Sequence, residues 1–190
     1  YESGTVGGAL RLANCLRVAA GKAGWGAKRL PPNTAMGVAL SSAEERQSPT
    51  WVAGVAEVTV DPATGRYKVN KLTIAMDMGI AINPDNVRAQ IMGSALWGTS
   101  QVMYERLTYK NGAIEQTNFH EYTPIRQVDV PEFDIELIES GRHPVGVGEP
   151  ASTVVAPAVA NAIFNAVGAR VRHMPITPQA VLEAMKKRKA

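Results

Sequence analysis

The chain has 190 residues, of which 45% are hydrophobic and 19% are charged, and its formal net charge is +3. This length and composition allow one domain with a sizeable core and exclude a disordered tail. The charge excess is too small to indicate a nucleic-acid-binding protein, and we expect the basic run at residues 186–189 to be a solvated helix end.

Residues 9–25 carry apolar and small side chains at helical spacing, with Gly24 and Gly26 as stop signals. The pattern predicts an amphipathic helix in which Cys15 is buried as a small hydrophobic residue. Cys15 is the only cysteine of the chain. The chain by itself therefore cannot form a disulfide, a structural zinc cluster of cysteines or a cysteine-ligated iron–sulfur cluster.

Two strands are predicted after this helix, at residues 36–40 and 51–61. A strong turn signal at residues 61–65 separates the second of them from a return strand at residues 67–76. Apolar side chains alternate along both partners, with one face formed by Val52, Ala56, Val58 and Val60 and by Leu72, Ile74 and Met76. We therefore expect an antiparallel hairpin.

Asn83 and Pro84 mark the start of a second helix, because asparagine is a favourable N-cap and proline suits the first helical position. The helix is expected to continue to about Tyr104. Its middle is rich in small residues, namely Gly93, Ser94, Ala95 and Gly98. These residues lower helix propensity, so either another backbone or a ligand is expected to pack closely against them.

A short hairpin is predicted around Asn111 and Gly112, because both residues tolerate the positive φ angles of such a turn. A polar and aromatic loop follows at residues 116–126. The remaining predicted elements are a strand at residues 133–138 and helices at about residues 157–167 and 178–187. Antiparallel or mixed strand hairpins packed with helices, without regular strand-helix-strand repetition, predict an α+β fold class.

The glycine-rich loop at residues 144–150 holds one carboxylate, Glu149, between a glycine and a proline. Gly146 and Gly148 lack a Cβ, so the backbone there can take positive φ angles and approach a ligand closely. The proline after Glu149 is expected to hold it in an extended conformation, before a helix with Pro157 in its first turn. These residues alone are compatible with a catalytic carboxylate or with a solvated loop glutamate.

No apolar run in the sequence reaches the about 18 residues that a membrane span needs. The N-terminus also carries no basic segment that leads into an apolar stretch. We therefore expect a soluble chain, and the sequence does not distinguish a cytoplasmic from a periplasmic location.

Four motifs occur in a fixed order along the chain: DMGIAINP at residues 77–84, RAQIMG at 88–93, NFHEY at 118–122 and GEP at 148–150. In this order they resemble the C-terminal part of the molybdenum-binding subunit of the xanthine dehydrogenase and aldehyde oxidase family. Within that family they most resemble the isoquinoline 1-oxidoreductase β-subunit branch. The resemblance extends from about residue 10 to about residue 177.

The resemblance implies that residues 1–190 form the C-terminal molybdopterin-binding domain of such a subunit, as a fragment of a larger protein. The chain begins at Tyr1 rather than at methionine, which fits a fragment. The glycine-rich motifs that complete the pocket in the family are not in this sequence, so this part of an oxidoreductase is expected to be inactive alone. The alternative is a non-catalytic fragment or an assembly module of such a complex.

The resemblance also implies a cofactor, molybdenum held by molybdopterin, as the cytosine dinucleotide form. Glu149 stands at the family position of the base that takes a proton from the attacking oxygen. Gln90 stands where an amide contacts the cofactor, and Gly146, Val147 and Gly148 stand where the backbone passes the metal. The carboxylate is expected in a dry pocket, where desolvation raises a carboxyl pKa. No side chain of this chain is predicted as a metal ligand.

The implied reaction is the oxidation of an aldehyde or an N-heteroaromatic substrate, with water as the oxygen source. The implied partners are the remainder of the molybdenum subunit, a separate subunit that carries iron–sulfur clusters, and a cytochrome c or another electron acceptor. Nucleic acid is not an expected partner. Tyr122 and Arg126 are predicted either to line the substrate route or to pack against their own loop.

The chain departs from the common family pattern at two positions. Met92 replaces a frequent acid, which is expected to alter packing or channel lining, and Ala151 replaces a frequent second proline, which loosens the loop. The histidines His120, His143 and His173 lack the paired spacing of metal ligands, so we expect them at the surface or behind the site.

Overall fold

The structure is a computed structural model that describes residues 5–45 and 48–189. Its helices are α1 (Thr5–Ala23), α2 (Pro84–Met103), α3 (Pro150–Val167), α4 (Pro178–Lys189) and the short 3-10 helix η1 (Gln127–Asp129). Its strands are β1 (Thr34–Glu45), β2 (Ser48–Val60), β3 (Tyr67–Gly79), β4 (Tyr109–Lys110), β5 (Ala113–Ile114) and β6 (Glu132–Glu139). Together they form an α+β fold with a mixed four-stranded sheet, which confirms the predicted fold class.

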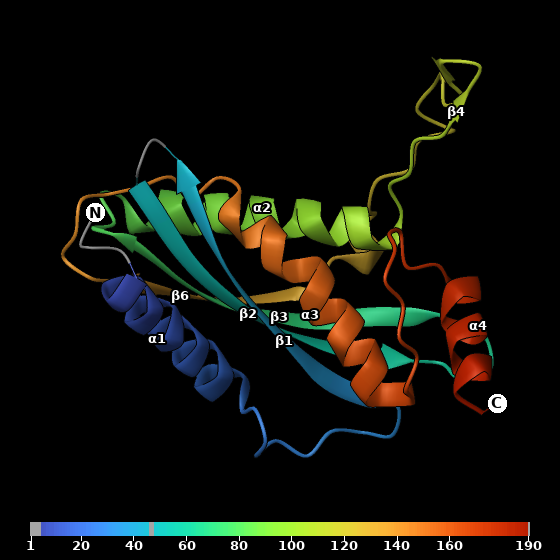
Figure 1. The fold of residues 1–190 in the computed structure, drawn as a ribbon, viewed down its shortest axis with the longest axis horizontal. Coiled ribbons are helices and arrows are strands. Elements are labelled where there is room, and N and C mark those ends of the chain that lie inside the picture. Colours follow the sequence, from blue (N-terminus) through green and yellow to red (C-terminus); the bar gives the residue numbers. More distant parts are fainter. Residues whose placement is uncertain (1–4, 46–47, 190) are drawn as a thin grey trace.

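The main sheet has the strand order β1-β2-β3-β6. β1, β2 and β3 pair antiparallel as two successive hairpins, so the predicted hairpin of β2 and β3 is confirmed. β6 instead pairs parallel to β3, and the chain reaches it by a crossover that contains α2 (Figure 1). Parallel neighbours require such a crossover, because a tight turn reverses the chain direction.

Helices pack on both faces of the sheet. Successive residues of β2 point to opposite faces, and both sets include buried apolar side chains that a helix can cover. Ala53 and Val55 lie in a small cluster with Cys15 and Ala19 of α1. α3 packs on β1 and β2, and α2 packs on α3. The larger core lies on this side of the sheet and contains the alternating strand residues predicted from the sequence together with apolar residues of α2 and α3. Its members include Val52, Ala56, Val58, Val60, Leu72, Ile74, Met76, Ile91, Val154, Val159 and Ile163.

Cys15 is fully buried between α1 and the sheet, as the sequence predicts. Its thiol donates a hydrogen bond to the carbonyl oxygen of Trp51 at 3.4 Å. Burial raises the pKa of the Cys15 thiol to about 11. The thiol therefore stays protonated near neutral pH and packs as a small hydrophobic group.

α2 begins and ends where the sequence predicts. Asn83 is its N-cap and accepts a hydrogen bond from the backbone N–H of Asn86 at 3.1 Å. A Cβ at Gly98 would lie 3.0 Å from the Cα of Ser152, so the α3 backbone occupies this side of α2. Another backbone therefore packs on the small-residue surface at Gly98, whereas no atom lies within 4 Å of the missing Cβ of Gly93.

α3 begins at Pro150 rather than at Pro157, and this corrects the prediction. Pro150 occupies the first turn, where a residue without an N–H loses no helical hydrogen bond. Pro157 lies inside the helix on its exposed side. Pro157 has no N–H, so the carbonyl of Thr153, four residues earlier, has no helical hydrogen-bond partner. Thr153 is exposed as well. Water can satisfy that carbonyl, which lowers the cost of a proline at this position.

The earlier start gives α3 18 residues with a mean hydropathy of 1.3, so it is long and apolar enough to cross a membrane by length and composition. This differs from the expectation that no segment reaches such a length. The buried stripe of α3 includes Val154, Val155, Val159 and Ile163, and it packs on β1 and β2. An apolar stripe that packs on a sheet is typical of a core helix.

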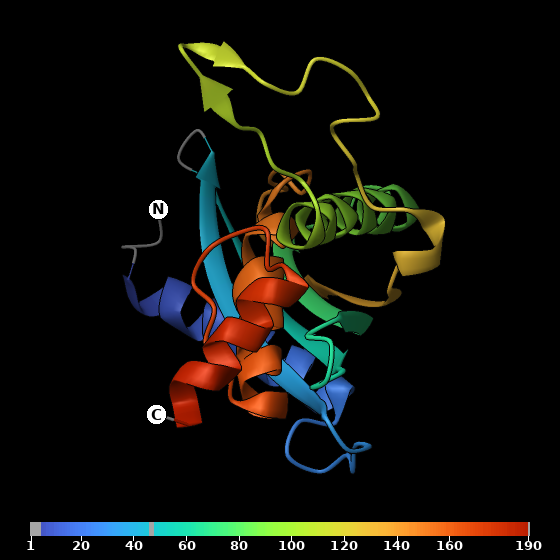
Figure 2. The same ribbon diagram turned by 90° about the vertical axis from the view of Figure 1, so that its right-hand side faces the viewer.

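The small hairpin of β4 and β5 stands away from the body of the molecule (Figure 2). Asn111 and Gly112 form its turn with φ angles of 51° and 79°, which confirms the predicted turn. Below the turn, the Thr108 N–H donates to Gln116 Oε1 at 2.7 Å, and Gln116 Nε2 donates to Thr108 Oγ1 at 2.9 Å. The residues of this hairpin are largely exposed, so burial contributes little to its order. These local hydrogen bonds hold its two arms together instead.

At Gly37 of β1, the sheet and α3 approach each other closely. A Cβ at this position would lie 2.1 Å from Ala158 O and 2.2 Å from Ala162 N. Gly37→Ala is therefore expected to push α3 away from the sheet and to lower the free energy of unfolding by about 3 kcal/mol, in the upper range for overpacking. Urea denaturation of the native protein measures the loss.

Gly21→Ala is the matched control for this substitution. Gly21 lies on the exposed side of α1, where no atom lies within 4 Å of its missing Cβ. Alanine there is expected to be neutral or to stabilise the protein by up to about 1 kcal/mol. If Gly37→Ala cost less than about 1 kcal/mol, the close approach of α3 to β1 would be wrong.

Candidate active site

The end of β3 positions the segment that leads into the glycine-rich loop. The Ile80 N–H donates to Arg142 O, and the Val145 N–H donates to Met78 O, each at 3.0 Å. Gly79 has a φ of 82°, and a Cβ there would lie 2.3 Å from His143 O. Only glycine therefore allows the incoming segment to lie this close to the end of the sheet.

Two buried hydroxyl groups hold the loop at its two ends. Thr50 of β2 donates from Oγ1 to Gly146 O at 2.8 Å. Ser94 of α2 donates from Oγ to Glu149 O at 2.9 Å. Both side chains are 3% exposed. A hydrogen bond that is shielded from water fixes the groups it joins, so the loop between Gly146 and Glu149 is tied to the sheet and to α2.

The loop conformation corrects the prediction for Glu149, and its glycines do not use the positive φ angles that are open to them. Gly146 and Gly148 are not among the glycines with positive φ angles. Glu149 is not extended: it is the N-cap of α3, with φ −124° and ψ −28°. The Ser152 N–H donates to Glu149 O at 3.0 Å, and this first bond of the helix holds the Glu149 backbone at the helix end.

Three of the predicted site residues lie on one surface of the molecule. A Cβ at Gly148 would lie 3.6 Å from Gln90 Oε1, so the loop passes directly beside this amide of α2. Glu149 follows Gly148, and its side chain makes no capping hydrogen bond. Gly146 is tied down by Thr50, and Val147 is half-buried and packs against the core. The Gln90 amide thus lies beside the exposed backbone that leads into Glu149.

Gln90, Gly148 and Glu149 are all exposed in this chain. The expected dry pocket around the Glu149 carboxylate is therefore not formed by the residues that the structure describes. α2, the loop and the start of α3 make one wall, and a wall on one side cannot exclude water. The desolvation that raises a carboxyl pKa requires further groups opposite this wall.

A buried ion pair ties α1 to the end of β3, close to the segment that feeds the loop. Arg11 donates from Nε and Nη2 to the two carboxylate oxygens of Asp77, at 2.8 Å and 2.7 Å. Asp77 also accepts hydrogen bonds from Ser140 Oγ and the Gly79 N–H. Burial by itself raises the pKa of Asp77, but these donors outweigh it and hold the pKa below its ordinary value.

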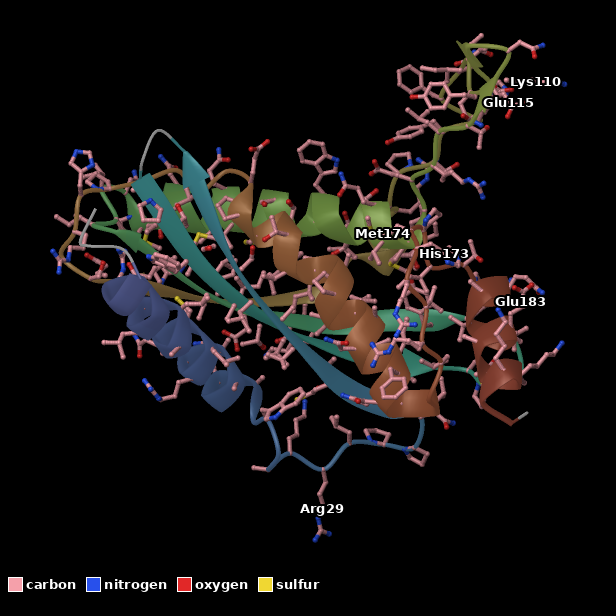
Figure 3. All side chains as sticks on the ribbon, in the orientation of Figure 1. Arg29, Lys110, Glu115, His173, Met174 and Glu183 are labelled. Atoms are coloured by element: carbon pink, nitrogen blue, oxygen red, sulfur yellow. The ribbon has the colours of Figure 1, made fainter. Side chains whose placement is uncertain are left out.

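The histidines do not gather into a site. His120, His143 and His173 are exposed, as expected for surface residues, and His173 lies in the connection before α4 (Figure 3). Within residues 5–45 and 48–189, no three histidine, cysteine or acidic side chains lie together as a metal-binding group. Tyr122 donates a hydrogen bond to Glu105, and this carboxylate raises the pKa of the Tyr122 hydroxyl. Through its hydroxyl, Tyr122 therefore contacts the segment that follows α2.

The hydroxyls of Thr50 and Ser94, which hold the loop, were not predicted as site groups from the sequence. A signal for Ser94 was present, since Ser94 follows Gln90 by four residues, and residues four apart lie on the same face of a helix. Ser94 had been read only as a small residue. Thr50 had no comparable signal, because Gly146 is far from it along the chain and only the folded sheet brings them together.

Residues 20–131 match the molybdopterin cofactor-binding domain family. The chain belongs to this family. It is 49% identical, over 95% of its length, to the membrane-bound aldehyde dehydrogenase (pyrroloquinoline-quinone) of Gluconacetobacter polyoxogenes. It is 31% identical, over 88% of its length, to the isoquinoline 1-oxidoreductase subunit beta of Brevundimonas diminuta. The chain spans only 23% and 21% of the lengths of these two relatives.

Solved structures share the fold of this molybdopterin-binding domain. The aldehyde oxidoreductase of Desulfovibrio gigas matches with a TM-score of 0.63 and 30% identity, over 73% of this chain and 16% of that one. The quinoline 2-oxidoreductase of Pseudomonas putida 86 matches with a TM-score of 0.66 and 24% identity, over 74% of this chain and 19% of that one. The second likeness is one of fold alone.

The comparisons confirm the wider xanthine dehydrogenase and aldehyde oxidoreductase family that the motifs indicate. Identity to the isoquinoline-type relative is lower than identity to the aldehyde dehydrogenase, so the comparisons do not favour the isoquinoline branch.

The residues on the exposed wall fit a molybdopterin cofactor. The Gln90 amide can both donate and accept hydrogen bonds, which suits the mixed polar edge of a pterin. The backbone at Gly148 is exposed, and a Cβ there would lie 3.6 Å from this amide, so a cofactor held by Gln90 would lie close to the loop backbone. Glu149 directly follows Gly148 in the chain, and its carboxylate is not used for capping.

Proposed function

We propose that residues 1–190 are the C-terminal molybdopterin-binding domain of a larger molybdenum-binding subunit, in an enzyme that oxidises aldehydes with water as the oxygen source. One observation carries the proposal: the Gln90 amide lies beside the exposed backbone of Gly148, which leads directly into the exposed and uncapped Glu149. The 49% identity to a relative named aldehyde dehydrogenase favours an aldehyde over an N-heteroaromatic substrate.

In this proposal the cofactor is molybdopterin cytosine dinucleotide with molybdenum. When bound, it would accept the two electrons that leave the substrate carbon, because no natural side chain can do so. Gln90 holds it through its amide, and Gly146, Val147 and Gly148 lie against it through their backbone. Thr50 keeps Gly146 in place from β2.

Glu149 is the catalytic base of the proposed reaction. Oxidation of an aldehyde to an acid breaks the C–H bond, forms a bond from carbon to the oxygen of water, and releases two protons and two electrons. A carboxylate oxygen of Glu149 accepts the proton that the attacking oxygen loses. The two electrons leave through an iron–sulfur partner subunit to a cytochrome c or another acceptor.

We propose that residues 1–190 lie in a soluble part of the enzyme, because the apolar stripe of α3 packs on the sheet. The words membrane-bound in the name of the Gluconacetobacter relative apply to that enzyme. In the present proposal, attachment to a membrane would come from another part of the protein or from a partner.

Cofactor analysis of the native complex tests this function. We expect molybdenum, pterin and cytosine nucleotide in stoichiometric amounts, and oxidation of aldehydes in preference to N-heteroaromatic compounds. The isolated 190-residue chain is expected to retain no molybdenum, because Gln90 and Glu149 form only one wall of the site. Pyrroloquinoline quinone in a complex without molybdenum would overturn the proposed cofactor. Stoichiometric molybdenum on the isolated chain would show that this domain is complete by itself.

Gln90→Ala is expected to weaken cofactor retention by roughly 2- to 13-fold in the assembled enzyme, since one hydrogen bond contributes about 0.5–1.5 kcal/mol. The fold should be unaffected because the Gln90 side chain is exposed. Molybdenum content after extended dialysis measures the effect. Gln101→Ala, farther along α2, is the control and should retain the cofactor. Normal retention together with a sharply lower Tm would assign Gln90 a structural role instead.

A further inference from the structure

The first turn of α3 is capped in an unusual way. An N-cap side chain normally accepts a hydrogen bond from the backbone N–H two or three residues later, and serine, threonine, aspartate and asparagine do this well. Glu149 is the N-cap of α3, but its carboxylate makes no such bond. The helix therefore needs another acceptor for its first N–H groups.

Ser94 of α2 supplies that acceptor from outside the helix. The Ser152 N–H donates to Ser94 Oγ at 3.0 Å, and the same hydroxyl donates to Glu149 O at 2.9 Å. Ser152 also donates from its own Oγ to Glu149 O at 2.8 Å. Ser152 is the third residue of α3, the position whose N–H an N-cap side chain usually binds.

We propose that Ser94 is a positioning residue: it caps α3 from the neighbouring helix and so leaves the Glu149 carboxylate free to act as a base. The inference rests on the proposed function for the role of Glu149, but the capping itself does not. Ser94 is 3% exposed, so water cannot readily replace its hydroxyl. The side chain at position 149 is thereby released from the task that an N-cap residue normally performs.

The geometry also explains how Ser94 acts on the reaction without touching the substrate. Gly98, one turn further along α2, lies against the Ser152 backbone, so α2 and α3 are in register at this point. Ser94 fixes the Glu149 carbonyl within this contact. Without the Ser94 hydroxyl, the Ser152 N–H keeps its bond to Glu149 O but loses the Ser94 acceptor, and Glu149 O loses the Ser94 donor. The backbone of Glu149 is then held less firmly, and its carboxylate becomes available to cap its own helix instead of acting as a base.

Ser94→Ala in the assembled enzyme is the test, with Thr99→Val as the matched control. Thr99 is a fully buried hydroxyl of the same helix that donates to Ala95 O at 2.8 Å and does not contact α3 through that bond. Hydrogen exchange at residues 150–155 measures the capping and needs no activity. The reductive half-reaction with an aldehyde, in wild-type and Glu149→Gln backgrounds, measures the effect on Glu149.

We expect faster exchange at residues 150–155 in Ser94→Ala than in Thr99→Val. We also expect a kcat lowered by about 10- to 100-fold, as for a misplaced catalytic group, with KM within about twofold and normal molybdenum content. In the Glu149→Gln background, Ser94→Ala should have no further effect, since it acts through Glu149.

Three results would overturn the inference. Unchanged exchange in Ser94→Ala would show that Ser94 does not cap α3. Faster exchange with a wild-type kcat would show that the cap does not position the base. A further loss of rate in the Glu149→Gln background would show that Ser94 acts independently of Glu149. If Glu149→Gln itself kept wild-type activity, the proposed base would be wrong, whereas the exchange measurement would still decide the capping.

Discussion

Glu149→Gln is expected to slow the reductive half-reaction by about 10²- to 10⁴-fold while the molybdenum content stays at the wild-type level. Glutamine keeps the size of the side chain but is not basic near neutral pH. The Glu149 side chain is exposed and makes no capping hydrogen bond, so its replacement leaves α3 intact. Single-turnover reduction by an aldehyde, alongside metal analysis of the assembled enzyme, separates chemistry from cofactor binding.

Glu183→Gln makes the same chemical change at an exposed position on α4, away from the loop (Figure 3). Its rate and metal content should match those of the wild type. A Glu149→Gln enzyme with full molybdenum content and a rate within about threefold of wild type would show that this carboxylate is not the base, because a general base contributes far more.

Arg11→Ala is expected to lower the free energy of unfolding by about 3 kcal/mol at neutral pH. Its guanidinium binds both carboxylate oxygens of Asp77, and the Asp77 side chain is 3% exposed. Loss of Arg11 leaves a buried carboxylate without this guanidinium, and among the described residues Ser140 Oγ and the Gly79 N–H remain as its donors. Urea denaturation of the native protein measures the effect.

Lys28→Ala is the control for this prediction. Lys28 pairs with Glu57 at 2.6 Å, but its side chain is 48% exposed. An exposed pair contributes less than about 1 kcal/mol, because water screens it. A loss as large as that of Arg11→Ala would contradict the argument that burial decides the strength of the two pairs.

The effect of Arg11→Ala should depend on pH. The folded state lowers the pKa of Asp77, so the ion pair stabilises the protein fully above the unfolded-state pKa of about 3.9. Its contribution is lost as the pH falls through the lower pKa of the folded state. The stability difference between wild type and Arg11→Ala should therefore be largest near neutral pH and shrink below about pH 4. An equal difference at pH 7 and pH 3 would refute this account.

Sequence by itself determined the features that depend on neighbouring residues. The cap at Asn83, the turn at Asn111 and Gly112 and the alternating strands β2 and β3 lie where predicted. Each depends on local backbone preference or on side-chain period, which a few consecutive residues encode. The order of the four motifs likewise indicated the family before any contact was known, and residues 20–131 match it.

Tertiary structure alone decided the features that join distant parts of the chain. Only the fold shows that β6 lies parallel to β3, that Arg11 neutralises Asp77, and that α3 begins at Pro150. Local preference favoured an extended Glu149, but the Ser152 N–H and the Ser94 hydroxyl hold it as the N-cap of α3. The Ser152 bond is local to α3, but the Ser94 bond connects residues that are far apart in sequence. Its energy enters only when α2 and α3 pack together, and it then helps to outweigh the weak local preference.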